Sequence, residues 1–161
     1  MDTAPADVLA RYPVPRRHRL TRCDYYRLAE VGILAPDDRV ELLEGQLVDM
    51  APIGPRHAIV TDNLNELLIR GFASRARVRC QEPVVLDDGS EPRPDFALVR
   101  RPWIGYPHTH PGPDDIFLLI EVADSSLSFD RTVKLELYAR AGILDVEGLP
   151  GVTVPVAEVF A

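Results

Sequence analysis

The amino-acid sequence predicts a single α/β or α+β domain, in which a mixed central sheet is covered by two longer helices. The chain has 161 residues, of which 46% are hydrophobic, so it can bury one sizeable core but is too short for two ordinary domains. Segments with the apolar spacing of helices also alternate with short segments typical of strands. We therefore expect an extended N-terminal arm over residues 1–20 and one domain over residues 21–161.

The first part of the domain should be a short helix followed by a hairpin. Thr21 and Asp24 have the spacing of a helix N-terminal cap, and the apolar residues that follow keep helical spacing. Val40–Leu43 and Gln46–Met50 flank the dipeptide Glu44-Gly45, a pattern typical of two short strands joined by a tight turn.

The middle of the chain should hold the first long helix and several strands. Apolar residues recur at helical spacing from Pro55 to about Ala73. Arg77–Cys80 and Pro83–Leu86 have the composition of strands, and a turn separates the second of them from a further strand at Asp95–Val99. Because that turn is short, we expect Pro83–Leu86 and Asp95–Val99 to pair antiparallel.

The last part of the domain should be a buried strand and a second helix. Residues 101–113 form a proline-rich loop, after which Ile116–Val122 is a nearly continuous apolar run. Such a run predicts a central strand that is buried on both faces. Helical spacing returns over Leu127–Ala141 and stops at Gly142.

Charge and composition narrow the classes of function. The net charge of −7 argues against a protein that coats nucleic acid, although a local arginine patch could still bind it. The sequence has no apolar run of the roughly 20 residues that a membrane-spanning helix needs, and no apolar run follows a basic segment near residue 1. We therefore expect a cytoplasmic protein without membrane contact, whose two cysteines are reduced.

Glu121 is the most informative candidate for a site. It interrupts an apolar run, where burying an unpaired carboxylate would cost several kcal/mol. A divalent cation is the simplest partner, and Asp95, at the start of a neighbouring predicted strand, could supply a second oxygen ligand. Alternatively, the Glu121 side chain reaches solvent or pairs with a nearby arginine.

Lys134 is the only lysine in the chain, against 17 arginines. It follows Glu121 by 13 residues, so a helix that packs back over the sheet would bring its ammonium group to the two carboxylates. There it could position a water molecule and stabilise charge on a scissile phosphate. The alternative is an ordinary surface lysine on an amphipathic helix.

Taken together, these segments resemble the Uma-type family of the PD-(D/E)xK, restriction-endonuclease-like superfamily. The resemblance covers roughly residues 20–143. It is carried by residues 94–99, Ile120-Glu121-Val122, Ser125-Ser126, Asp130, Lys134 and residues 138–143, with further similarity at residues 41–48 and 55–57.

This resemblance implies a restriction-endonuclease-like sheet flanked by helices and a metal-dependent endonuclease that cleaves DNA. Asp95 and Glu121 would hold Mg²⁺ or Mn²⁺, and Lys134 would serve the nucleophilic water. In this family the lysine has left the strand position two residues after the glutamate, which is Ala123 here, and is replaced from the next helix.

The same resemblance suggests supporting residues. Glu44 and His57 are candidates, although Glu44 could equally be a solvent-facing hairpin residue and His57 a residue of the helix start. Gln81 or Glu82 could supply a further ligand, and the alternation of the strand does not decide which of them faces the site.

The chain departs from the family pattern after Ile143, where the strand that completes the core is missing. The exposed sheet edge would be covered by a partner in a homodimer, by an exchanged segment, or by Val152–Val159. This departure supports an alternative function, a catalytically inactive nuclease-like remnant that acts as a binding or structural domain. A third possibility is a structural domain without metal, in which an arginine compensates Glu121.

Overall fold

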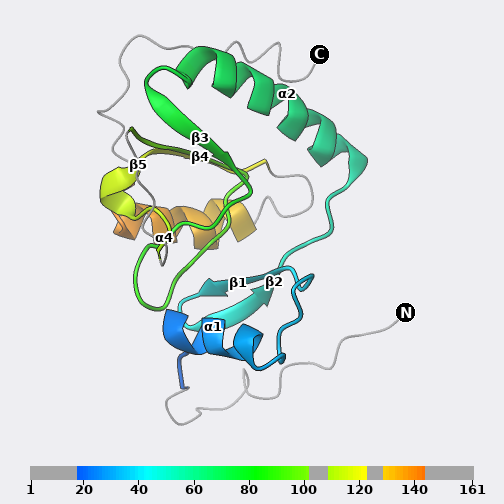
Figure 1. Cartoon of the computed structure of the whole chain (residues 1–161), viewed down its shortest axis with the longest axis vertical. Helices are drawn as coiled ribbons and strands as arrows, with labels where there is room; N and C mark the ends of the chain where they lie inside the picture. The colour runs from blue at the N-terminus through cyan, green and yellow to red at the C-terminus, as the bar shows by residue number, and fades with distance from the viewer. Residues whose placement is uncertain (1–17, 102–108, 123–128, 144–161) are drawn as a thin grey trace.

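A computed structural model describes residues 18–101, 109–122 and 129–143 of the chain (Figure 1). These residues form an α+β architecture with a two-stranded sheet and a three-stranded sheet, which is compatible with the restriction-endonuclease-like fold and confirms the predicted class. Some of the predictions fall outside the described residues, namely those for residues 1–17, 102–108, 127 and 144–161.

The first helix and the hairpin form as predicted. Helix α1 (Arg22–Glu30) begins with a capping box, in which Thr21 and Asp24 each accept a hydrogen bond from the other's backbone N–H. Strands β1 (Val40–Leu43) and β2 (Gln46–Asp49) pair antiparallel. The turn between them has φ angles of 52° and 74°, the left-handed conformation that tight hairpin turns require.

Helix α2 (Pro55–Phe72) is the predicted long helix, and it covers one face of the three-stranded sheet. Proline at its first position suits a helix start, because the first N–H groups have no partner within the helix. Its buried residues Leu64, Leu68 and Phe72 pack against Phe96 and Leu98.

The three-stranded sheet has the order β3-β4-β5, formed by β3 (Ala76–Cys80), β4 (Phe96–Arg100) and β5 (Ile116–Ile120). Both pairings are antiparallel, so the described strands contain no parallel pair of the kind a mixed sheet would have. The prediction that the run at residues 116–122 is the central strand is wrong, because among the described strands β4 lies in the middle and β5 at an edge. Residues of β5 pack into both core clusters, so its apolar run reflects two covered faces and not two strand neighbours.

The prediction of a strand at Pro83–Leu86 is also wrong, because this segment belongs to no strand of the structure. Two of its N–H groups donate to carbonyls of prolines, from Val84 to Pro92 and from Val85 to Pro111. Proline accepts a hydrogen bond but has no N–H to return, so a regular ladder cannot form here. In place of this segment, β3 and β5 are the antiparallel partners of β4.

The last helical segment starts irregularly. Residues Asp130–Lys134 form a π-helical turn, η3, which continues into the short helix α4 (Leu135–Arg140). Tyr138 and Ile143 are buried against Ala97 and Val99, on the side of the sheet opposite α2. The predicted stop at Gly142 is confirmed by its φ of 79°.

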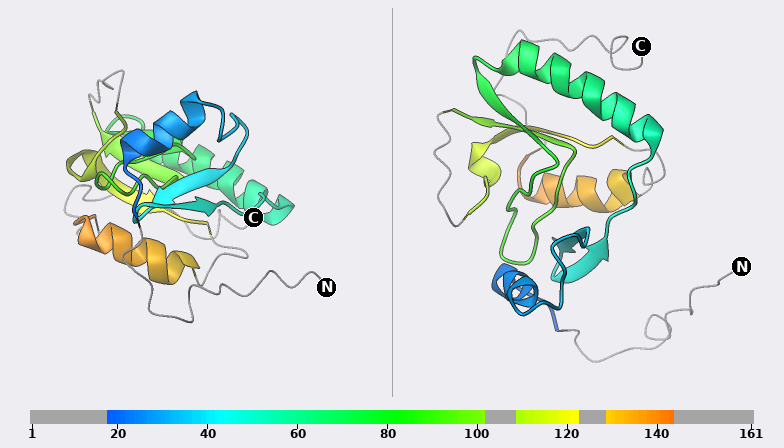
Figure 2. Two further views of the ribbon diagram at one scale, coloured as in Figure 1. Left: turned by 90° about the horizontal axis from the view of Figure 1, so that it is seen from below. Right: turned by 45° about the vertical axis from the view of Figure 1, so that its right-hand side comes forward.

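Helices α2 and α4 thus lie on opposite sides of the three-stranded sheet, and α1 lies beside the hairpin at the end of the molecule away from α2 (Figures 1 and 2). Two ion pairs join α4 and its preceding turn to the hairpin, one from Lys134 to Glu41 and one from Arg140 to Glu44. No helix in the described part of the chain combines the length and the apolar composition needed to cross a membrane.

Candidate active site

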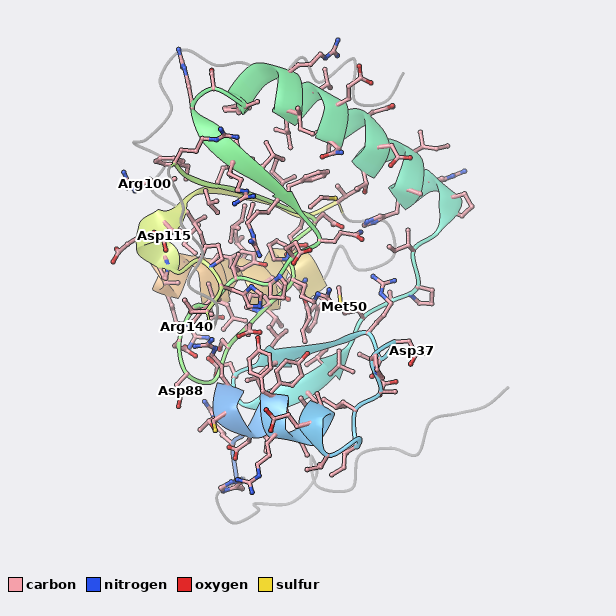
Figure 3. All side chains as sticks on the ribbon, viewed as in Figure 1. Asp37, Met50, Asp88, Arg100, Asp115 and Arg140 are labelled. Atoms are coloured by element: carbon pink, nitrogen blue, oxygen red, sulfur yellow. The ribbon has the colours of Figure 1, made fainter. Side chains whose placement is uncertain are left out.

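A cavity of about 420 Å³ lies where the hairpin and the linker to α2 meet the sheet. Its apolar wall comes from the end of β2 and from the linker, including Met50 and Ile53, and Figure 3 labels Met50 at this end of the hairpin. Its polar wall contains all three residues of the predicted constellation, Asp95, Glu121 and Lys134.

Asp95 lies directly before β4, at the head of the central strand. Its Oδ2 accepts a hydrogen bond of 2.8 Å from the backbone N–H of Val122, which ties it to the residue next to Glu121. His57 Nε2 lies 2.8 Å from Asp95 Oδ1, and Gln81 Nε2 donates to the same oxygen at 3.3 Å. An ionised carboxylate only accepts hydrogen bonds, so this contact is a hydrogen bond in the tautomer that has the proton on Nε2.

Glu121 lies one residue beyond the end of β5, and its side chain is 15% exposed. Its Oε1 accepts a 2.5 Å hydrogen bond from the Tyr138 hydroxyl and lies 3.3 Å from Lys134 Nζ. Burial raises the pKa of Glu121 from 4.5 to about 7, and the charges of Asp95 and Glu41 add to this rise, while Lys134 and Tyr138 oppose it. The protein alone therefore stabilises the ionised form of Glu121 less than water does.

Lys134 is buried, with 6% of its surface exposed, and it bridges two carboxylates. Its Nζ donates to Glu41 Oε1 at 3.0 Å and lies 3.3 Å from Glu121 Oε1. Burial lowers the pKa of Lys134, but the charges of Glu121 and Glu41 and the hydrogen bonds to them outweigh this and raise the pKa above 10.5. The ammonium group thus stays protonated, and the alternative of a surface lysine is wrong.

The π-helical turn η3 ends at Lys134. A π turn has more residues per turn than an α-helix, so it changes which side chains of the following residues face the sheet, and such turns are frequent at functional sites. After it, Lys134 and Tyr138 lie one α-helical turn apart and both reach Glu121 Oε1.

Sequence reasoning missed Glu41 as a member of this network. Glu41 is 3% exposed, and its Oε1 accepts hydrogen bonds from Lys134 Nζ and, at 2.7 Å, from the backbone N–H of Arg93. The signal was present, because Glu41 interrupts the apolar segment Val40–Leu43 as Glu121 interrupts its own run. The Tyr138 hydroxyl was missed as well, since an aromatic residue at helical spacing is ordinarily a core residue.

Two of the predicted supporting residues lie away from the cavity. Glu44 is in the hairpin turn and pairs with Arg19 and with Arg140, and Figure 3 shows Arg140 on the side of the molecule away from Met50. The Glu82 side chain is 55% exposed and lies 3.7 Å from Arg79. The structure instead brings His57 and Gln81 to Asp95.

The chemistry of the donors fits Mg²⁺ or Mn²⁺. Asp95 and Glu121 line the same cavity, and the contacts of Glu121 with Tyr138 and Lys134 are made at Oε1. Among the residues that the structure describes, no group of three or more His, Cys, Asp or Glu side chains gathers with the spacing of a metal site. Mg²⁺ does not require one, because it is commonly held by one or two carboxylates and keeps several waters.

The comparisons with known proteins agree with the sequence resemblance. No curated protein sequence matches the chain. The model of the Uma2 family, described as "Putative restriction endonuclease", matches residues 23–146, which is more than half of the chain. The match includes every residue that lines the cavity. The chain therefore belongs to the Uma2 family of restriction-endonuclease-like proteins.

Proposed function

We propose that this protein is a Mg²⁺- or Mn²⁺-dependent endonuclease that hydrolyses phosphodiester bonds of DNA. The observation that carries the proposal is the meeting of Asp95, Glu121 and a buried, ion-paired Lys134 in one cavity. Membership of the Uma2 family supports nuclease chemistry at the level of the family.

The surroundings of each residue indicate its role in the proposed reaction. Asp95 and Glu121 would hold the metal ion, which would supply a Lewis acid for the phosphoryl oxygen and lower the pKa of a bound water. His57 keeps the Asp95 carboxylate oriented through the 2.8 Å contact. Lys134 is protonated, so its role is to orient Glu121 and to stabilise negative charge on the phosphate, and not to remove a proton.

The test compares wild-type protein with Asp95→Asn, which keeps the side-chain volume, and with Glu44→Gln as a matched control outside the cavity. Each sample is titrated calorimetrically with Mn²⁺ and then assayed for nicking of supercoiled plasmid, and circular dichroism verifies the fold. We expect Mn²⁺ binding and nicking in wild type and in Glu44→Gln, and the loss of both in Asp95→Asn. Wild-type protein that binds no Mn²⁺ would overturn the proposal.

One observation favours a second candidate, a structural or binding domain without catalysis. Lys134 already pairs with Glu121 and Glu41, so the network is partly compensated without a metal ion. Under this alternative, Glu121→Gln changes the free energy of unfolding but leaves Mn²⁺ binding undetectable in every variant, including wild type.

The expected homodimer stays a prediction. Within the described residues β5 pairs only with β4, so one edge of this strand has no described neighbour. Sedimentation equilibrium would determine whether two copies associate.

A further inference from the structure

We propose that Arg93 and Arg39 form the phosphate-binding wall of the cavity and hold the backbone of the nucleic acid strand against Asp95, Glu121 and Lys134. The inference rests on the proposed function of this site and deepens it by naming residues that bind the substrate. Both arginines line the cavity, and neither belongs to the acidic constellation.

The backbone holds Arg93 in a defined place. It lies between Pro92 and Pro94, both less than 2% exposed, and a residue before proline is restricted to extended conformations. Its N–H donates to Glu41 Oε1 at 2.7 Å, the same oxygen that accepts from Lys134 Nζ. The start of the Arg93 side chain is thereby fixed beside the ion-pair network.

The guanidinium of Arg93 has no protein partner among the described residues. Among the described residues, the one hydrogen bond between Arg93 and a side chain is made by its backbone N–H, which donates to Glu41. The residue is nevertheless half-buried. A guanidinium offers five N–H donors in a planar fork that matches phosphate oxygens. A half-buried, unpaired cation that lines a cavity is well placed to take an anion from outside the protein.

Arg39 supplies a second cation to the lining of the cavity. It precedes β1, and its backbone carbonyl accepts from the N–H of Met50 at 2.8 Å, which anchors it at the end of the hairpin. Among the residues that the structure describes, its side chain makes one hydrogen bond, at 3.3 Å to the carbonyl of Ala51. Most of its N–H donors therefore remain available.

The charge balance of the cavity explains why these two residues are needed. Its lining contains four carboxylates, and the only lysine is committed to two of them, Glu41 and Glu121. A polyanion would be repelled from such a wall, in a protein with a net charge of −7, unless other cations met its phosphates. Among the residues lining the cavity, Arg39 and Arg93 are the cations that remain. The remaining two carboxylates are Asp49 and Asp95.

The experiment measures binding of a fluorescein-labelled DNA duplex by anisotropy, with Ca²⁺ as the cation and over a series of salt concentrations. Samples are the full-length wild type, Arg93→Gln, Arg39→Gln, Arg93→Lys and the control Arg77→Gln, which removes an exposed arginine of β3 outside the cavity. We expect about tenfold weaker binding for Arg93→Gln and for Arg39→Gln. The slope of log affinity against log salt should fall by about 0.9 for each lost phosphate contact.

Arg93→Lys keeps the charge and should retain most of the slope, whereas Arg77→Gln should bind as wild type does. Binding and slopes in Arg93→Gln and Arg39→Gln that equal those of Arg77→Gln would overturn the inference, as would an absence of salt-dependent binding in wild type. A thermal unfolding curve for each variant separates loss of binding from loss of fold.

The plasmid-nicking assay on the same proteins separates this inference from the proposed function. Nicking by wild type together with unchanged binding in Arg93→Gln would support the proposed nuclease and contradict the proposed role of the arginines. Binding that depends on Arg93, without any nicking in Mn²⁺, would support the role of the arginines and contradict the proposed nuclease.

Discussion

Glu121 is subject to opposing electrostatic influences at the mouth of the cavity. Burial and the negative charges of Asp95 and Glu41 favour its protonated form, while Lys134 and Tyr138 favour its ionised form. Burial is the largest of these effects, so the pKa rises to about 7, well above the ordinary 4.5. Between these two values the folded protein binds a proton that the unfolded chain does not, and this contribution to stability is lost as the pH rises through about 7.

Metal affinity should therefore depend on pH through Glu121. A metal ion binds the ionised carboxylate, so protons compete with it below a pH of about 7. We expect the apparent Mn²⁺ affinity of wild type to fall about tenfold per pH unit below that point and to level off above it. Calorimetric titrations from pH 5.5 to about 8.5 measure this, and an affinity that is flat across the range would contradict the assignment of Glu121 as a ligand.

Tyr138→Phe removes one donor from Glu121 without changing the packing of the ring. Because the hydroxyl lowers the pKa of Glu121, its loss should move the pH midpoint of Mn²⁺ binding upward. A hydrogen bond to a charged group is worth roughly 1.5–3 kcal/mol, so we also expect a loss of stability of that order. Leu137→Ile, a conservative change at the neighbouring buried position, is the control; a midpoint equal to that of the control would show that the hydroxyl does not act on Glu121.

At the scale of elements, local signals predicted the helices and the hairpin well. Capping residues, helical spacing and the Glu44-Gly45 turn each act within a few residues, so α1, α2 and the hairpin could be read from the chain. The position of β5 in the sheet, and whether residues 83–86 form a strand, depend on hydrogen-bond partners far along the chain. Neither periodicity nor composition specifies those partners.

The candidate site divides in the same way. Asp95, Glu121 and Lys134 could be nominated from chemistry and from the family resemblance. The π turn that presents Lys134 has no sequence signal of its own, because the apolar spacing through it still suits an α-helix. The sequence alone does not show that Glu41, and not Glu44, belongs to the site. That depends on the register of the hairpin, in which the Glu41 carboxylate faces inward and Glu44 lies in the turn.

Gly45 should be the most sensitive glycine of the hairpin. Its φ is +74°, and a Cβ placed on it would lie 2.5 Å from Arg19 Cβ. Gly32 has a similar φ of +78°, with nothing described within 4 Å of its Cβ position, so it is a matched control. We expect Gly32→Ala to cost about 1 kcal/mol and Gly45→Ala to cost clearly more, at about 2–3 kcal/mol. Urea unfolding measures both, and equal losses would show that the approach to Arg19 is easily relieved.

At the scale of the whole molecule, the ion pair between Lys134 and Glu41 connects the hairpin to the C-terminal helix. Both side chains are buried, with 7% and 3% exposed. Arg22 makes a second long-range connection, since its Nε donates at 2.8 Å to Glu91, which is also buried and accepts from the Tyr26 hydroxyl. The hairpin and α1 are thus joined to the rest of the chain by charged contacts as well as by packing.

Lys134→Met should be strongly destabilising, by about 3–5 kcal/mol, because it leaves two buried carboxylates without their cation. The double variant Lys134→Met with Glu41→Gln should lose less than the sum of the two single changes, since the second change removes one of the uncompensated charges. Urea unfolding of the four proteins in the cycle measures the coupling. Additive losses, within about 0.5 kcal/mol, would mean that the pair contributes nothing as a pair.

The 93 residues that separate Lys134 from Glu41 also set the order in which the two halves of this ion pair are made during synthesis. The ribosome releases the hairpin long before the helix that carries the ammonium group, so a nascent chain holds Glu41 without its partner. Contacts of such long sequence separation close late, after local helices and turns have formed. In the proposed nuclease, the site would be complete only after residue 134 has been made and the helical segment that carries it has folded against the hairpin.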